Sequence, residues 1–384
     1  MNLELTAEQE SFRRDVCQLL CEESVRAEVA AARRLPADAE PGFLQVYRRL
    51  GERGWLAVNW PPEHGGLGGD LVQKAILTEE LILHGIPDVV HTLSVDIVGL
   101  AVQRLGTPEQ RARWLPRIAS GEGAGCVLLS EPDVGSDLGS LTTRAEPDGD
   151  GWRLHGRKVY NLKSQFADFA LCAARTTESE VRMHGITVFI VPMRTPGVRV
   201  RPLWSMSDER FNEVTLSGIR MTAADVLGEV DGGWQVLTDL LGLERTGIEF
   251  EAKARRLLDA VLDEAERAGT LDGEYGERLV ELDAEVRAGR LLSWRALGGM
   301  AGGELDDVQC GMAKWHTTET GRLISELAPE LCGLTALLNA RDEESPDGWL
   351  LESAFRDAPG LTVASGTSEV MLSMIASAGL GLPS

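Results

Sequence analysis

Apolar residues recur every three or four positions along the N-terminal third of the chain, a spacing typical of amphipathic helices. Thr6 followed by Gln9 forms a capping box at the start of the first such run. Further helices are expected in VQKAILTEELILHG, which stops at Gly85, and in PEQRARWLPRIAS, which begins after Thr107. The pattern predicts a helical N-terminal region.

The pattern changes near Gly121, where the segments become short and rich in Val, Ile, Thr and Phe. GITVFIVP, GVRVRPL and NEVTLSGIRM are separated by turn signals such as PDGDG, as in strands and hairpins. The chain then becomes helical again, beginning with one long helix through GGWQVLTDLLGLERTGIEFEAKARRLLDAVLDEAERAG. We therefore predict an N-terminal helical domain over 1–122, a β domain over 123–228 and a C-terminal helical bundle over 229–384.

Composition and charge narrow the possible partners. The 384 residues are 43% hydrophobic, enough for a large core, and 38 basic against 60 acidic residues give a net charge of −22. This charge argues against binding to nucleic acid or to an anionic membrane, since both require a basic surface. No apolar run approaches the ~18 residues that cross a bilayer, and MNLELTAEQESFRRD lacks a signal-peptide core. We expect a cytoplasmic protein without a membrane span.

The six cysteines favour buried free thiols over a metal site. Cys17 and Cys21 share one helix face at i, i+4, which could suit a metal, but no histidine lies near them and no CxxC occurs. The six histidines form no HxxxH or HExxH pattern. The sequence predicts no metal site.

The stretch LLSEPDVGSDLGSLTTRAE places small and hydroxyl residues in a loop between expected strands. Backbone N–H groups and hydroxyls in such a loop can approach a phosphate. The stretch is neither GxGxxG nor a Walker loop, so those two nucleotide-binding motifs are excluded. Taken alone, a cluster of Gly, Ser and Asp is most often only a turn.

Six segments, in order along the chain, resemble the motifs of the acyl-CoA dehydrogenases. SEPDVGSD resembles that family's T/S-E-P-x-x-G-S-D signature, and the other five are WPPEHGGLGG, LGTPEQRARWLPRIASGE, GRKVYNLKSQFADFALCAART, VTLSGIRMTAADVLGEVDGGW and VASGTSEVMLSMIASAGLGLP. The likeness runs from residue 5 to residue 383. It implies a mainly α fold with a central β-barrel, between an N-terminal helical domain and a C-terminal four-helix bundle.

The resemblance also implies an activity. Family members hold FAD between the β domain and the bundle and oxidise an acyl thioester, carried by CoA or by an acyl carrier protein, to its trans-2-enoyl form. A carboxylate removes the α-proton while the β-hydride goes to flavin N5, and electron-transfer flavoprotein is the implied electron acceptor. The α-proton is weakly acidic, so the base needs a desolvated position on a rigid element. A homo- or hetero-oligomer, dimer or tetramer, is expected.

The resemblance identifies Glu244 as this base. Medium-chain members carry a glutamate before the Gly-Thr of the C-terminal motif, where this chain has Ser365. Isovaleryl-type members place it on the helix after the β domain in an L-x-x-E-R context, which LLGLERTGIEF matches at Glu244 and Arg245. Arg245 is a substrate-binding candidate. A Glu-Arg step within a helix is more often exposed, as we expect for Glu249 and Glu251.

The family's contacts to flavin and substrate are matched at only some positions of this chain. Glu131 is a second carboxylate candidate, but its family counterpart is structural. Ser136 matches a serine near the CoA moiety, and GLT at 333–335 matches the segment at the adenine end of FAD. The cofactor-binding candidates are Leu129, Ser130, Tyr160, Leu162, Thr367 and Glu369.

Three departures weaken the expected flavin contacts. Leu162 replaces the threonine that meets flavin N5, Met371-Leu372 replaces a Q-R pair, and LDGEYGERLVELDAE lacks the arginine and glutamine that reach the partner's FAD. Each lost hydrogen bond is worth about 1 kcal/mol. Two alternatives therefore stay open: a FAD-poor subunit of a heteromeric acyl-CoA dehydrogenase, and a related flavin-dependent oxidase or monooxygenase.

Overall fold

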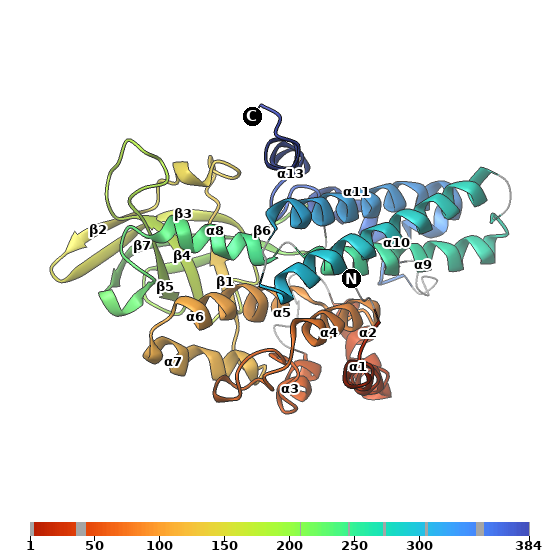
Figure 1. Ribbon diagram of the computed structural model, residues 1–384, viewed down its shortest axis with the longest axis horizontal. Helices are drawn as coiled ribbons and strands as arrows, with labels where there is room; N and C mark the ends of the chain where they lie inside the picture. The colour runs from red at the N-terminus through yellow and green to blue at the C-terminus, as the bar shows by residue number, and fades with distance from the viewer. Residues whose placement is uncertain are drawn as a thin grey trace.

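The computed structural model describes residues 4–35, 44–207, 209–244, 246–271, 274–303, 306–342 and 349–383, without the side chains of 239–244, Glu274 and Trp349. Helices from the N-terminal part lie below, a twisted sheet lies to one side, and long C-terminal helices lie to the other (Figure 1). No helix among the described residues has both the length and the apolar character needed to cross a membrane.

Short helices form the N-terminal part, and three of them begin at capping boxes. The predicted box of Thr6 and Gln9 is confirmed, as is the cap at Thr107, which pairs with Gln110. Asp70 forms a third box, at the start of α4. The helices are α1 (Ala7–Leu20), α2 (Glu23–Arg33), α3 (Gln45–Gly51), α4 (Leu71–Leu83), α5 (Val89–His91), the π-helix η3 (Thr92–Gly99), α6 (Leu100–Leu105) and α7 (Pro108–Ala119).

The middle of the chain forms one sheet, as the alternating segments predict. In spatial order its strands are β6, β7, β3, β2, β4, β5 and β8, and β1 pairs with β4 in parallel. Their bounds are β1 (Gly125–Leu128), β2 (Arg144–Asp148), β3 (Gly151–Leu162), β4 (Phe169–Arg175), β5 (Ile186–Pro192), β6 (Val198–Leu203), β7 (Phe211–Met221) and β8 (Val226–Leu227).

The expected closed barrel is not what this sheet shows. Among the described strands, no ladder joins β6 to β8, which are the two ends of the strand order. β8 has only two residues, which leaves little backbone to pair. β6 exposes Arg199, Arg201 and Pro202, and charged residues and proline are typical of an edge strand that avoids further pairing. The sheet is therefore open.

Helices also form the C-terminal part, and the long helix expected after the sheet is broken into two. The first half ends at Glu244, and the second begins at Ile248 after Gly247, whose φ is 81°. A Cβ at Gly247 would lie 2.6 Å from Ser293 Oγ and 2.9 Å from Ala313 Cβ, so the chain passes where only glycine fits. The helices are α8 (Gly233–Glu244), α9 (Ile248–Ala268), α10 (Glu274–Ala301), α11 (Asp307–Cys332), α12 (Trp349–Leu361) and α13 (Ser368–Met374).

The largest core joins the N-terminal helices to one face of the sheet. Trp114 of α7 stacks on Phe169 of β4 with ring centroids 4.2 Å apart. Val236 and Leu237 of α8 belong to the same core. A second core covers the other face of the sheet, and a third lies among α9, α10, α11 and α12. The first half of helix α8 is thereby packed against the sheet.

Candidate active site

Glu131 holds the loop that follows β1. Its Oε1 accepts hydrogen bonds from Lys158 Nζ at 2.9 Å and from the backbone N–H of Thr143 at 2.8 Å. Its Oε2 accepts from Thr142 N at 2.7 Å and from Thr142 Oγ1 at 2.6 Å. Burial alone would raise the pKa of Glu131, but Lys158 and these hydrogen bonds lower it to about 2. A carboxylate so fully bonded is a poor proton acceptor near neutral pH, and its contacts are those of a structural anchor.

The anchored loop lies beside β3. Lys158 Nζ also donates to the backbone oxygen of Leu129 at 2.9 Å, and Val159 N donates to that of Ser130 at 3.0 Å. The β3–β7 register shifts between Lys158 and Asn161, and Tyr160 at this bulge has a φ of 57°. Its side chain is 62% exposed. Bulges and left-handed non-glycine residues cluster at functional sites. The fold therefore brings four cofactor candidates together, Leu129, Ser130, Tyr160 and Leu162.

The region around the bulge, formed by Leu129, Ser130, Tyr160 and Leu162 and called here the corner beside β3, also contains buried polar atoms without hydrogen-bond partners among the described residues. Asn161 and Asn212 each donate a side-chain N–H to the other's backbone oxygen, at 3.2 and 3.0 Å. Asn212 Oδ1 and Ser164 Oγ are buried and have no hydrogen-bond partner among the described atoms. An unpaired buried polar atom costs roughly 1–3 kcal/mol, so the corner favours a polar ligand over none.

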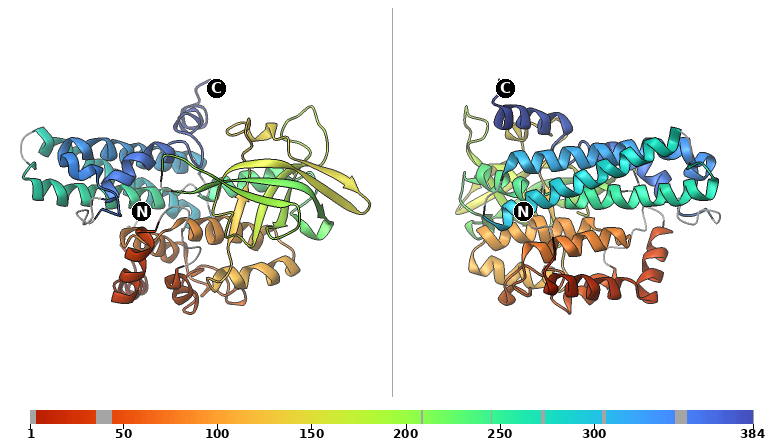
Figure 2. Two further views of the ribbon diagram at one scale, coloured as in Figure 1. Left: turned by 180° about the vertical axis from the view of Figure 1, so that it is seen from behind. Right: turned by 45° about the vertical axis from the view of Figure 1, so that its right-hand side comes forward.

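Thr367 and Glu369 lie on a different element, the short helix α13. Thr367 caps it by accepting a hydrogen bond from Val370 N at 3.3 Å. Lys314 of α11 donates to the backbone oxygen of Gly366 at 2.8 Å and so fixes the preceding turn. Met371, which replaces a family glutamine, is fully buried. Helix α13 packs on α11, near the C-terminus (Figure 2), and the pair Thr367 and Glu369 is a separate group from the loop beside β3.

Glu244 is the last residue of α8, not a residue in the middle of a helix. Its side chain and the whole of Arg245 lie outside the described residues. Helix α8 packs on β5 and on η3, and its Trp234 contacts the core that also packs against Leu129 and Leu162. Both α8 and the loop beside β3 therefore pack on the large core between the N-terminal helices and the sheet.

A small cavity of about 40 Å³ begins directly after the break in the helix. Lys74 and Asp96, whose Nζ and Oδ1 are 3.1 Å apart, form a charged pair in its wall. The remaining lining residues are Leu71, Ala75, Thr78, Thr92, Thr246, Ile248, Glu249, Leu297 and Met300. The cavity contains both apolar and charged groups within a few residues of Glu244.

The expectation that Glu251 is at the surface is wrong. The residue is only 1% exposed, and neither carboxylate oxygen has a hydrogen-bond partner among the described atoms. Arg290 Nη1 is 3.6 Å from Oε2. Burial raises the pKa of Glu251 to about 7, against the opposing effect of Arg290. Glu249 is partly buried and pairs with Lys253. A helix repeat cannot reveal this burial, since it depends on packing against α10 and α4.

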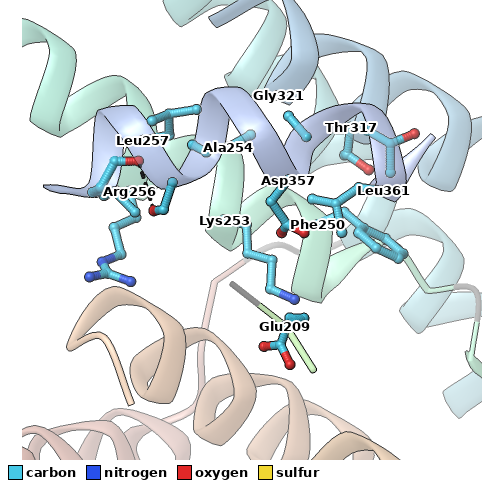
Figure 3. A pocket seen from close by; sticks show the side chains of 15 residues that line it. Glu209, Phe250, Lys253, Ala254, Arg256, Leu257, Thr317, Gly321, Asp357 and Leu361 are labelled. Carbon is cyan, nitrogen blue, oxygen red and sulfur yellow. Dashed lines mark hydrogen bonds between the residues drawn. The ribbon is translucent and has the colours of Figure 1, made fainter. Parts of the chain in front are cut away.

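A larger cavity, of about 250 Å³, lies between α9, α11 and α12 (Figure 3). Glu209, Lys253 and Asp357 form its polar side, and burial together with Glu209 raises the pKa of Asp357. Leu361 lies at another edge, and its backbone oxygen accepts a hydrogen bond from Lys314. None of the site residues predicted from the sequence lines this cavity. It is therefore distinct from the predicted site.

Ser136 and segment 333–335 are exposed parts of the surface. Ser136 lies in the loop after β1, beside Asp137, which pairs with Arg182 at 2.7 Å. Leu334 is 82% exposed. Within this single chain, neither Ser136 nor Leu334 lies in the corner formed by Tyr160. Both positions remain predictions.

Comparison with known proteins identifies the class of the chain. Three family models match it: acyl-CoA dehydrogenase N-terminal domain over residues 6–122, middle domain over 126–219 and C-terminal domain over 231–380. The acyl-CoA dehydrogenase FadE26 of Mycobacterium tuberculosis is 30% identical, with 100% of this chain and 99% of that protein covered. The chain therefore belongs to the acyl-CoA dehydrogenase family, whose members are FAD-dependent oxidoreductases acting on CH–CH bonds.

Solved structures agree with this assignment. The Tcur3481-Tcur3483 steroid ACAD matches with a TM-score of 0.90 at 28% identity, covering 100% of both chains. The ChsE4-ChsE5 complex from Mycobacterium tuberculosis matches with a TM-score of 0.87 at 28% identity, again covering 100% of both chains. The chain is similar to one chain of each structure along its whole length.

Proposed function

We propose that the chain oxidises an acyl-CoA thioester to its 2-enoyl form, with Glu244 as the base that removes the α-proton. The observation that carries the proposal is the break in the helix. It ends α8 at Glu244, and the residues that follow the break, Thr246, Ile248 and Glu249, line a small cavity. FAD, when bound, supplies the hydride acceptor.

The corner beside β3 fits a flavin ring. The backbone of Leu129 and Ser130 lies along the bulge at Tyr160, and the unpartnered Asn212 Oδ1 and Ser164 Oγ can bond a polar cofactor. Leu162 supplies no hydroxyl, so only backbone groups serve there. Thr367 and Glu369 are assigned to the phosphate and adenosine end of FAD, and Ser136 and Arg245 to the substrate.

Glu244 must be more basic than an exposed carboxylate to remove an α-proton. Desolvation raises the pKa of a carboxylate and so increases its basicity. The sequence LLGLE around it is apolar, which supports this requirement. Glu131, by contrast, is held ionised by Lys158 and has no oxygen left for a substrate proton. The electrons would pass to an electron-transfer flavoprotein.

A second candidate function is that of a subunit that needs an unlike partner to hold FAD. The C-terminal segment exposes a series of apolar side chains that a partner would cover. Their exposed fractions are Val370 41%, Leu372 44%, Leu380 70% and Leu382 53%. Apolar residues concentrated in this way are typical of an interface. Two relatives with matching folds are named as pairs of proteins, Tcur3481-Tcur3483 and ChsE4-ChsE5.

The visible absorption spectrum of the chain purified alone separates the two functions. Near-stoichiometric FAD, bleached without oxygen by one of a panel of acyl-CoA thioesters, is the expected result. Repeating the panel with the same acyl groups on acyl carrier protein identifies the carrier. A folded chain that stays colourless with excess FAD contradicts self-sufficient catalysis and favours the partner-dependent subunit. Bound flavin that oxygen reoxidises rapidly after reduction would instead favour an oxidase.

A further inference from the structure

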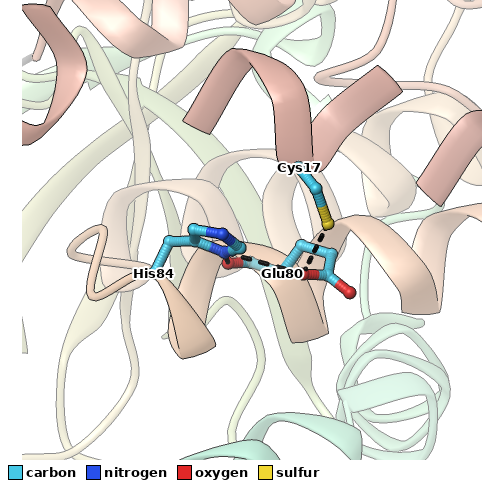
Figure 4. Close-up of side chains that lie close together, drawn as sticks. All are labelled: Cys17, Glu80 and His84. Atoms are coloured by element: carbon cyan, nitrogen blue, oxygen red, sulfur yellow. Dashed lines mark hydrogen bonds and ion pairs between the residues drawn. The ribbon is translucent and has the colours of Figure 1, made fainter. Parts of the chain in front are cut away.

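Two pairs of metal-binding side chains meet where α1 packs against α4. Cys17 and Cys21 are spaced i, i+4 at the end of α1, and Glu80 and His84 are spaced i, i+4 at the end of α4. One ligand atom from each of Cys17, Glu80 and His84 lies within 4.8 Å of the others. Figure 4 shows these three side chains converging from the two helices. No histidine lies near these cysteines in the sequence, which therefore predicts no metal site, but the fold brings His84 to them.

The four side chains present suitable atoms to one another. Cys17 Sγ donates a hydrogen bond to Glu80 Oε2 at 3.1 Å, and Cys21 Sγ is 3.5 Å from His84 Nε2. His84 Nδ1 is 2.8 Å from the backbone oxygen of Glu80. A proton on Nδ1 satisfies that contact and leaves the Nε2 lone pair free on the side of Cys21. A backbone partner on the second ring nitrogen is the usual arrangement for a metal-binding histidine.

Arg13 sets the charge of the cluster. Its Nε is 3.2 Å from Glu80 Oε1 and its Nη2 is 2.6 Å from Glu79 Oε2, while Glu80 Oε2 accepts a hydrogen bond from Cys17 Sγ. The positive charge of Arg13 offsets the carboxylate. Two thiolates from Cys17 and Cys21 would then balance a divalent cation. A cluster of this composition is electrically neutral when it holds one such ion.

The ligand atoms of the four side chains indicate which class of metal the site would bind. Thiolate and imidazole favour zinc over magnesium or calcium, which prefer oxygen alone. With Zn–S of about 2.3 Å and Zn–N or Zn–O of about 2.0–2.2 Å, the edges of a tetrahedral site are roughly 3.3–3.7 Å. The sulfur–oxygen distance of 3.1 Å and the sulfur–nitrogen distance of 3.5 Å are close to those edges. Cys21 lies outside the group of atoms within 4.8 Å of one another, so its side chain has to turn toward Cys17 and Glu80 to complete a tetrahedron.

We propose that Cys17, Cys21, Glu80 and His84 form a zinc-binding site that ties α1 to α4. Binding replaces the two S–H bonds with two sulfur–metal bonds, and both protons pass to solvent; no oxidation occurs. Because the ion has to displace the thiol protons, metal affinity should increase with pH. The site is independent of the proposed catalytic role of Glu244.

Metal binding to the full-length chain tests the proposal. After dialysis against a chelator, Co²⁺ is added and its thiolate charge-transfer absorption is recorded, and Zn²⁺ affinity is measured by competition with Co²⁺. We expect one metal per chain and the release of up to two protons. Cys17→Ser and His84→Gln should each weaken Zn²⁺ binding by roughly a hundredfold or more, since loss of even a supporting partner costs about 10–100-fold. His184→Gln, at an exposed histidine elsewhere, should bind normally.

A further variant keeps the test decisive if the substitutions at the partly buried Cys17 and His84 impair folding. Cys21 is exposed, so Cys21→Ser should fold like the wild type. Zn²⁺ should raise the Tm of the wild type and of His184→Gln, but not that of Cys21→Ser. No stoichiometric metal at micromolar free Zn²⁺, or equal affinity in wild type and Cys21→Ser, would overturn the proposal.

Discussion

Replacing Glu251 with glutamine should change how the stability of the protein depends on pH. Glu251 is buried, both of its oxygens lack hydrogen-bond partners, and burial raises its pKa from 4.5 to about 7. Between pH 4.5 and about pH 7, Glu251 is therefore protonated in the folded state and ionised in the unfolded state. Stability from this group is complete below pH 4.5 and is lost as the pH rises to about 7.

The magnitude follows from the difference between the two pKa values. One pKa unit corresponds to about 1.4 kcal/mol, so the full effect is about 3 kcal/mol, and most of it falls between pH 5 and pH 8. Glu251→Gln keeps the shape of the side chain without a titrating group. The variant should therefore gain roughly 2–3 kcal/mol relative to the wild type across that range.

Urea unfolding at pH 5, 6, 7 and 8 measures this difference. Glu266→Gln is the matched control, because Glu266 lies on the same helix and is exposed. The control should follow the wild type at every pH. The reasoning is refuted if the difference between Glu251→Gln and the wild type does not change with pH, because Glu251 would then be ionised at every pH tested.

Three further substitutions test other parts of the account. Glu131→Gln leaves the fully buried Lys158 unpaired and should lower the free energy of unfolding by about 3–5 kcal/mol, measured by urea unfolding. Gly247→Ala forces a left-handed φ of 81° on a residue with a Cβ and should cost about 1–3 kcal/mol, measured as a lower Tm; an unchanged Tm would contradict the break in the helix. Leu162→Thr restores the family hydroxyl and should tighten FAD binding by roughly fivefold, about 1 kcal/mol, measured by flavin fluorescence titration; unchanged affinity would count against this flavin position.

Local signals in the sequence predicted most of the elements. The box at Thr6 is predicted because the capping residue and Gln9 are three positions apart, and Thr107 is predicted as a cap because a hydroxyl residue precedes the helix. Alternating segments between turn signals predicted the strands. The break before Gly247 was missed, since the apolar repeat continues on both sides of it and the reason for the glycine is Ser293, on another helix. Whether the sheet closes depends on whether its two edge strands pair, and the pattern of a single strand does not show this.

Side-chain contacts between the helices could not be predicted from the sequence, because they depend on how distant helices pack. The burial of Glu251 depends on packing against α4 and α10, and the meeting of Cys17 with His84 depends on how α1 packs against α4. Neither contact leaves a short spacing in the sequence. Of the six cysteines, Cys126, Cys172, Cys310 and Cys332 are buried and form no disulfide among the described residues, whereas Cys21 is exposed and Cys17 partly so.

The most direct test of the central claim compares the wild type with Glu244→Gln. Each flavin-loaded protein is mixed without oxygen with the acyl-CoA thioester that bleaches the wild-type flavin, and Glu266→Gln serves as the control. We predict that Glu244→Gln binds FAD and the thioester normally but leaves the flavin oxidised and exchanges no α-proton with deuterated solvent. Bleaching of Glu244→Gln at the wild-type rate would contradict the account, because the base would then be another residue.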